Sequence, residues 1–217
     1  MYSNLALDTL QLQKLNNIIM SSILVLVHSK KGSTFSLAEE ICTGVEKCSM
    51  AEPKLRRVEE LKKRNTDSPL ESPYHDTPVV QKKDVIDCDA LIMGSPTRFG
   101  NMSTELKHFV DQTLDVWISG DLIGKVGAVF TSTGSMHGGQ ESTLISMMLP
   151  LLHHGMILTG IPYSEPQLSS TLSGGTPYGA SHVSFETNKN ELSKDEVILA
   201  QALGERVARI TKKLTEK

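Results

Sequence analysis

The chain has few of the features that mark disulfide-rich, membrane or nucleic-acid-binding proteins. Its three cysteines are an odd number without a CxxC spacing, which argues against a disulfide framework or a zinc site and favours a reducing compartment, the cytoplasm. No apolar run reaches the roughly 20 residues that span a bilayer. The formal net charge is only −3 over 217 residues, so no nucleic-acid surface is predicted. We expect no metal site and no membrane span.

The first 21 residues also lack the features of a targeting segment. They contain no arginine and no basic cluster followed by a long apolar stretch, so neither a secretory signal nor a mitochondrial presequence is predicted. We interpret residues 1–21 as an N-terminal extension, either disordered or upstream of the natural start. Residues 22–217 are long enough to bury a substantial core, and we predict that they form a single domain.

What the sequence does contain is an alternation of apolar and amphipathic segments. Apolar runs predict strands at residues 22–29, 53–61, 88–95, 125–134 and 156–162. Helical spacing predicts helices at residues 35–48, 103–118 and 140–154, and a capping box of Ser193 and Glu196 begins a C-terminal helix. Residues 62–84 hold three prolines and are expected to form a loop. This alternation predicts a doubly wound α/β domain, with a parallel sheet and helices on both faces.

Three polar loops follow predicted strands and should meet at the carboxyl edge of the sheet, where ligands bind in this fold class. The first, SKKGST at residues 29–34, leads into a helix, and its N–H groups and hydroxyls suit a phosphate. Its spacing matches neither GxxxxGK[ST] nor GxGxxG, which excludes a nucleoside-triphosphate loop and a dinucleotide fingerprint. Plain capping of the helix by serine and threonine is an equally good interpretation of this loop alone.

The other two loops add different chemistry. TSTGSMHGG, at residues 131–139, offers backbone donors and close approach through its glycines, although a flexible turn can have the same composition. SPTRFGN, at residues 95–101, is stiffened by Pro96 and carries the cation of Arg98 beside the ring of Phe99. A phosphate loop, a ring and many donors together describe a site for a phosphorylated, flat molecule with polar edges. Flavin mononucleotide (FMN) meets that description.

Four motifs then carry a resemblance to a known family. The segments PTRFGNM, GGQE, HHGM and GGTPYGA occur in this order, and the chain from about Ile23 to its end resembles the WrbA-type NAD(P)H:quinone oxidoreductases. The resemblance implies a flavodoxin-like fold, with a five-stranded parallel sheet in the order 2-1-3-4-5. It also implies a set of FMN-binding residues, which are Ser29, Lys30, Lys31, Gly32, Ser33, Thr34, Pro96, Thr97, Arg98, Phe99, Ser132, Thr133, Gly134, Ser135, Met136, His137, Gly138 and His153.

The resemblance further implies an activity. The expected enzyme is an FMN-dependent oxidoreductase that takes hydride from NADH or NADPH and reduces a quinone by two electrons, in a ping-pong mechanism and in defence against oxidative stress. The family is typically a homotetramer whose neighbouring subunits complete each site, with His153 as a catalytic residue beside the flavin and Trp117 at the substrate. Lys31 stands where the family usually has an aromatic residue, which puts that residue's role at the nicotinamide in doubt. The alternatives are an electron-carrier flavodoxin, which the weak acidity disfavours, and a non-enzymic FMN-binding scaffold.

Four of these residues also have purely structural interpretations. Arg98 could form a surface ion pair, and Phe99 could seal the core under its loop. Trp117 is the only tryptophan and suits a subunit interface, while His153 near a helix end suits the helix dipole. Each interpretation predicts a different exposure and a different partner for the side chain.

Overall fold

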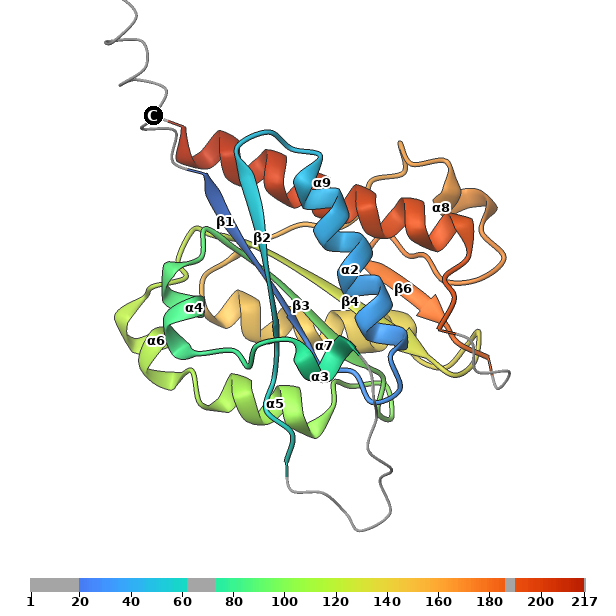
Figure 1. The fold of residues 1–217 in the computed structure, drawn as a ribbon, viewed down its shortest axis with the longest axis horizontal. Coiled ribbons are helices and arrows are strands. Elements are labelled where there is room, and N and C mark those ends of the chain that lie inside the picture. The colour runs from blue at the N-terminus through green and yellow to red at the C-terminus, as the bar shows by residue number, and fades with distance from the viewer. Residues whose placement is uncertain (1–19, 62–72, 186–189, 217) are drawn as a thin grey trace, which may run out of the picture.

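A parallel β-sheet forms the centre of the computed structural model. The structure describes residues 20–61, 73–185 and 190–216, so residues 1–19 of the predicted extension and residues 62–72 of the predicted loop lie outside the described residues. Strands β1 (Ser21–Val27), β2 (Ala51–Arg57), β3 (Ala90–Pro96) and β4 (Val126–Thr133) pair in parallel. With β5 (Ile157–Leu158) the order is β2-β1-β3-β4-β5, which confirms the predicted flavodoxin-like, doubly wound sheet (Figure 1).

The edge of the sheet beside β4 consists of two short strands. β5 pairs with residues 126–127 at the start of β4, and β6 (Ala180–Val183) pairs with residues 130–133 at its end. Both pairings are parallel. The predicted strand at residues 156–162 is therefore too long. β6 was not predicted, because its four residues show no recognisable strand pattern.

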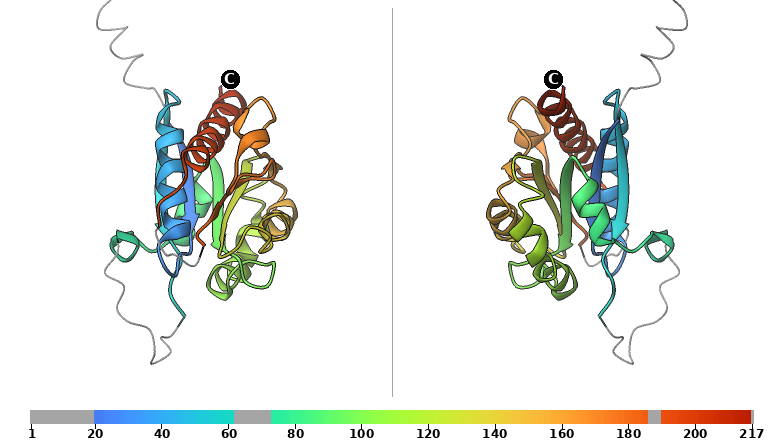
Figure 2. Two further views of the ribbon diagram at one scale, coloured as in Figure 1. Left: turned by 90° about the vertical axis from the view of Figure 1, so that its right-hand side faces the viewer. Right: turned by 90° about the vertical axis from the view of Figure 1, so that its left-hand side faces the viewer.

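Helices cover both faces of the sheet, as predicted (Figure 2). On one face, α2 (Ser33–Glu46) packs against α9 (Lys194–Thr215), and their apolar side chains form one core with alternate residues of β1, β3 and β4. The other face carries α4 (Lys82–Asp87), α5 (Thr104–Asp111), α6 (Leu114–Ser119) and α7 (Gln140–His153) over a second core. Two four-residue helices, α3 (Pro73–Asp76) and α8 (Gln167–Ser170), lie in connections. Because both faces are covered, the central strands are apolar throughout.

Three details of the secondary structure bear on the predictions. The predicted helix at residues 103–118 is two helices, and between them the Thr113 hydroxyl donates to the carbonyl of Val110 (2.7 Å). The predicted loop at residues 62–84 contains α3 and the first residues of α4. The capping box of Ser193 and Glu196 is confirmed at the start of α9. Within the described ranges, no helix combines the length and the apolar character that crossing a membrane requires.

Candidate functional site

The first loop leaves the buried end of β1 and enters α2. Gly32, which precedes α2, has a left-handed backbone (φ 98°), a conformation that glycine adopts without strain. The hydroxyl of Ser29 accepts hydrogen bonds from the N–H groups of Gly32 (3.1 Å) and Phe35 (3.3 Å). The N-cap residue provides no side-chain cap, and within the described residues the N–H groups of Ser33 and Thr34 have no such acceptor. This helix start can therefore serve an anion.

The hydroxyls of Ser33 and Thr34 have other partners. The buried Thr34 shares a hydrogen bond of 2.6 Å with the hydroxyl of Ser132 in β4. Ser33 Oγ donates to Asn190 Oδ1 at 3.0 Å. By contrast, α5 and α9 are each capped by a serine hydroxyl. Among the residues that the structure describes, only the Ser29 hydroxyl caps the start of α2, so capping does not account for the rest of the SKKGST loop.

The second loop presents Arg98 and Phe99 to solvent beyond the end of β3. The N–H of Thr97 donates to the carbonyl of Ser132 (2.9 Å), and the backbones of Arg98 and Asn101 exchange hydrogen bonds, so the turn is fixed at both ends. Phe99 is fully exposed and has a left-handed backbone (φ 53°), which is uncommon and costly for an aromatic residue. It does not seal the core. Among the described residues, the Arg98 guanidinium donates only to the carbonyl of Thr97 (2.7 Å), which leaves most of its N–H groups available to an anion.

The third loop is held by Gln140, the first residue of α7. Its amide nitrogen donates to the Thr133 hydroxyl (3.3 Å) and to the carbonyl of Met136 (3.2 Å). Its amide oxygen accepts from the Ser181 hydroxyl of β6 (2.8 Å). Gln140 is itself buried, whereas residues 134–137 are exposed. A buried amide thus shapes a loop whose outer residues face solvent.

Direct contacts bring the three predicted loops together. The bond between Thr34 and Ser132 joins the first loop to the third. The second loop meets α7 through a hydrogen bond of 2.6 Å between the hydroxyls of Thr97 and Thr143. A Cβ atom on Gly139 would lie 3.2 Å from the Cα of Gly100, so the second and third loops also touch.

These loops fit a flat ligand that carries a phosphate. The N–H groups of Ser33 and Thr34 at the start of α2 could bind the phosphate, and the exposed Lys30 and Lys31 add positive charge beside them. The exposed ring of Phe99 and the donors of residues 134–138 lie along the same edge. The strained backbone at Phe99 is typical of a residue held for a ligand rather than for packing.

Comparison with known proteins identifies the family of this chain. Residues 21–164 match the family described as NADPH-dependent FMN reductase. The chain belongs to this family. Among curated relatives, a protein named NAD(P)H dehydrogenase (quinone) from Trichlorobacter lovleyi is 38% identical over 203 residues, covering 90% of this chain and 100% of the relative. A protein of the same name from Acidithiobacillus ferrooxidans is 41% identical over 198 residues, covering 90% of this chain and 99% of the relative.

Solved structures support the fold of this FMN reductase family member. A flavodoxin, WrbA-like protein from Agrobacterium tumefaciens aligns with a TM-score of 0.61 and 24% identity, covering 89% of this chain and 98% of that one. A flavodoxin from the domain Archaea aligns with a TM-score of 0.58 and 19% identity, covering 89% of this chain and 99% of that one. At such identities the likeness concerns the fold alone. The curated relatives confirm the predicted kinship with NAD(P)H:quinone oxidoreductases.

The structure separates two predicted site residues from the three loops. His153 is the last residue of α7, whose first residue lies at the loops, and 14 helical residues span about 21 Å. Trp117 belongs to α6, and its Nε1–H donates to the carbonyl of His153 (2.8 Å). Figure 1 shows α6 on the left of the view and the start of α2 on the right. Within one chain, His153 and Trp117 therefore lie at the far end of α7 from the three loops.

Several residues of the site were not predicted. Gln140, Asn190 and Ser181 hold or border the loops through the hydrogen bonds described above. Gln140 lies in the motif GGQE, and Ser181 directly follows the motif GGTPYGA. The motifs therefore pointed to this region but did not indicate what these two residues do. Asn190 contacts Ser33, 157 residues away in the chain, and no local pattern marks it.

Proposed function

We propose that this chain is an FMN-dependent NAD(P)H:quinone oxidoreductase, with residues 22–217 as one FMN-binding domain. The observation that carries the proposal is the meeting of three loops at the carboxyl edge of the sheet, with a partly capped helix start on one side and a strained, exposed phenylalanine on another. Bound FMN would supply the redox chemistry, by accepting a hydride from NADH or NADPH and passing two electrons to a quinone. Family membership and the names of the curated relatives support this activity.

Each loop has a proposed task. The N–H groups of residues 29–34 would bind the FMN phosphate, and Lys30 and Lys31 would strengthen that binding or attract the phosphates of the nucleotide. The turn at residues 96–99 would hold the flavin ring, with Arg98 supplying donors and Phe99 an apolar surface. Backbone N–H groups of residues 132–138 would bond to the polar edge of the ring. If NAD(P)H and quinone use one slot in turn, the kinetics are ping-pong.

The remaining site residues imply a second copy of the chain. His153 and Trp117 lie together, joined by the hydrogen bond of Trp117 to the His153 carbonyl, at the far end of α7. His153 is exposed and Trp117 is half exposed. We therefore place them at the flavin of a neighbouring subunit, in a homotetramer, where His153 would stabilise charge on the quinone and Trp117 would flank it. Two-electron reduction in the cytoplasm would avoid radical products, which suits a role against oxidative stress.

Stopped-flow spectroscopy tests the activity. The FMN-loaded protein is mixed with NADH or NADPH and then with benzoquinone, and the flavin absorbance is followed. Bleaching by a nucleotide and recovery on adding the quinone are expected. Failure of both nucleotides to bleach the flavin would instead favour a one-electron carrier or a non-enzymic scaffold.

The assignment of the second loop is tested by Arg98→Ala. The variant should retain less FMN after dialysis, by about tenfold in affinity, because it removes charged donors from the ring site. Arg209→Ala is a matched control, since Arg209 is an exposed arginine of α9 that pairs with Glu205. Equal FMN retention in the two variants would refute the role of Arg98.

A further inference from the structure

A buried histidine faces two carboxylates. All three lie on the opposite side of β1 from α2, the helix that follows the first loop. His28 follows β1 directly and is 3% exposed. Its Nε2 lies 3.5 Å from Glu60 Oε1, and its Nδ1 lies 3.7 Å from Glu105 Oε2. One ligand atom from each of the three residues lies within 4.8 Å of the other two. We call these residues the His28 triad, and we propose that it binds a divalent transition-metal ion.

The contact between His28 and Glu105 is not explained by hydrogen bonding. Nδ1 is fully buried and has no hydrogen-bond partner among the described residues, and 3.7 Å is too long for such a bond. A neutral imidazole has only one N–H, so it can donate to one of the two carboxylates and must turn a lone pair toward the other. A lone pair facing a carboxylate is unfavourable unless a cation lies between them. A cation bound between Nδ1 and the Glu105 carboxylate would remove this conflict.

The spacing suits a metal ion as that charge. Bonds of about 2.1 Å from Zn²⁺ to nitrogen and oxygen, at a tetrahedral angle, place two ligand atoms about 3.4 Å apart. The 3.7 Å between His28 Nδ1 and Glu105 Oε2 is close to this value, and a carboxylate oxygen of Glu60 completes a set of three ligand atoms within 4.8 Å of one another. Imidazole nitrogen with carboxylate oxygen is a ligand set for first-row divalent ions such as Zn²⁺.

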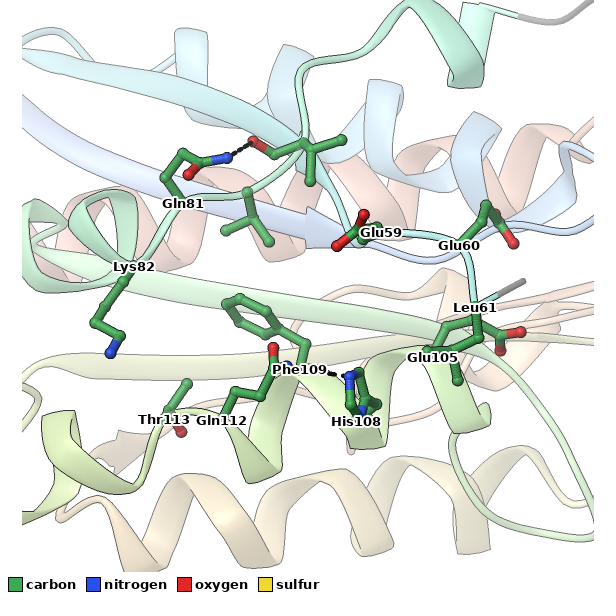
Figure 3. Close-up of a pocket in the computed structure, with 12 residues that line it drawn as sticks. Glu59, Glu60, Leu61, Gln81, Lys82, Glu105, His108, Phe109, Gln112 and Thr113 are labelled. Carbon is green, nitrogen blue, oxygen red and sulfur yellow. Dashed lines mark hydrogen bonds between the residues drawn. The ribbon is translucent and has the colours of Figure 1, made fainter. Parts of the chain in front are cut away.

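No basic side chain of the described region takes the place of the ion. In the part of the chain that the structure describes, neither Glu60 nor Glu105 pairs with a lysine or an arginine. Both carboxylates line a cavity of about 280 Å³ together with Glu59 and His108. Figure 3 shows Glu60 and Glu105 at one end of this cavity and Lys82 at the other, where Lys82 binds Asp115 (2.6 Å).

The cavity also gives an ion access and further ligands. Glu60 is partly exposed, with 39% of its side chain accessible, and Glu105 is 24% accessible. Water can complete the coordination from the cavity. Three protein ligands and an open position are typical of an accessible metal site rather than of a closed structural one. This inference revises the expectation from the sequence that the chain has no metal site.

Isothermal titration calorimetry with ZnCl₂ on the FMN-loaded, full-length protein tests the proposal. One site per chain is expected, and Glu105→Gln and Glu60→Gln should each weaken it at least tenfold. Glu59→Gln is the matched control, because it removes the same charge from the same cavity without removing a triad ligand, and it should leave the affinity within about twofold. Melting temperatures establish that each variant is folded, and the flavin plays no part in the readout.

Three outcomes would overturn the metal site. The first is the absence of a stoichiometric Zn²⁺ site in the unmodified chain, and the second is an affinity unchanged by Glu105→Gln. The third is an equal loss in Glu59→Gln, which would mean that the cavity attracts cations only through its charge. None of these results bears on FMN binding or quinone reduction, which the stopped-flow experiment tests separately.

Discussion

Two polar regions of this protein arrange their hydrogen bonds in opposite ways. In the Glu196 cluster, one buried carboxylate accepts from Ser173 Oγ (2.5 Å), from the N–H groups of Gly174 (2.8 Å), Val183 (3.0 Å) and Ser193 (2.7 Å), and bonds His182 Nδ1 (3.0 Å). At the carboxyl-edge loops, the start of α2 has no side-chain cap from its N-cap residue and Phe99 is fully exposed on a strained backbone.

This difference suggests two roles: the hydrogen bonds of the Glu196 cluster stabilise the fold, and the free groups of the loops are available to a ligand. The donors around Glu196 find their acceptor within the chain, so this cluster fastens β6 and residues 173–174 to α9. Among the described residues, some hydrogen-bond donors of the loops have no acceptor. The strained backbone at Phe99 places the ring in solvent, so the strain is not offset by packing. Changes in the Glu196 cluster should therefore cost stability, whereas changes in the loops should cost FMN affinity.

The largest effect is expected from Glu196→Ala. The change leaves His182 and several backbone N–H groups buried without an acceptor, and breaking such a buried pair typically costs about 3–5 kcal/mol. Urea unfolding of the apoprotein measures the loss. Glu205→Ala is the matched control on the same helix, because Glu205 is partly exposed and pairs with Arg209, an interaction worth about 0.5 kcal/mol or less. A loss below 1 kcal/mol for Glu196→Ala would contradict the comparison.

The same cluster predicts a dependence on acid. Burial alone would raise the pKa of Glu196, but hydrogen bonds from His182, Ser173 and the N–H of Ser193 lower it to about 2, against an ordinary value of 4.5. Because the folded-state pKa is depressed, this stabilisation is fully present above pH 4.5 and is lost as the pH falls toward 2. Between pH 6 and pH 2 the unmodified protein should lose about 3 kcal/mol more stability than Glu196→Gln. Equal losses measured by urea unfolding would show that Glu196 does not titrate in this way.

Gly32→Ala should mainly weaken FMN binding, whereas the changes at Glu196 mainly lower the stability of the fold. An alanine at φ 98° is strained by about 1–2 kcal/mol, and its Cβ would lie 2.4 Å from the amide nitrogen of Asn190. The loop should shift, and FMN affinity measured by fluorescence quenching should fall at least tenfold. Gly124→Ala introduces similar strain at φ 78° with no atom within 4 Å, away from the loops. If both variants lose FMN equally, the first loop has no special part in binding.

The positions of the three carboxyl-edge loops could be predicted from the sequence, whereas most contacts of the Glu196 cluster and of the His28 triad could not. Strand periodicity and the polar segments that follow each strand placed all three loops at one edge, because parallel strands share their carboxyl end. Ser193 and Glu196 were predicted as a capping box, which is a local pattern. That Glu196 also holds residues 173–174 and β6 depends on tertiary contacts, and the four residues of β6 have no strand signal of their own. The His28 triad joins residues 32 and 45 positions apart, so neither spacing nor composition could reveal it.

The limit of local reasoning is clearest at His153. The motif HHGM indicated a site residue, and the helix around it was predicted with nearly its observed bounds. A helix that follows a strand in this fold runs back along the sheet, so its first and last residues lie at opposite edges. That neighbouring subunits complete each site stays a prediction, and it would explain how His153 could act at the flavin.

The smallest expected change concerns Phe99→Gly. A left-handed backbone costs a non-glycine residue about 1–3 kcal/mol, and the added flexibility of glycine in the unfolded chain offsets about 0.5–1 kcal/mol. The apoprotein should therefore become more stable, by about 1 kcal/mol in urea unfolding, while FMN affinity falls because the exposed ring is lost. Met50→Gly relieves a similar backbone (φ 74°) at the start of β2 and should leave FMN affinity unchanged. If Phe99→Gly gains stability and loses FMN affinity, while Met50→Gly keeps its FMN affinity, the strain at Phe99 is retained for the ligand. If Phe99→Gly is instead less stable than the unmodified protein, the ring supports the fold.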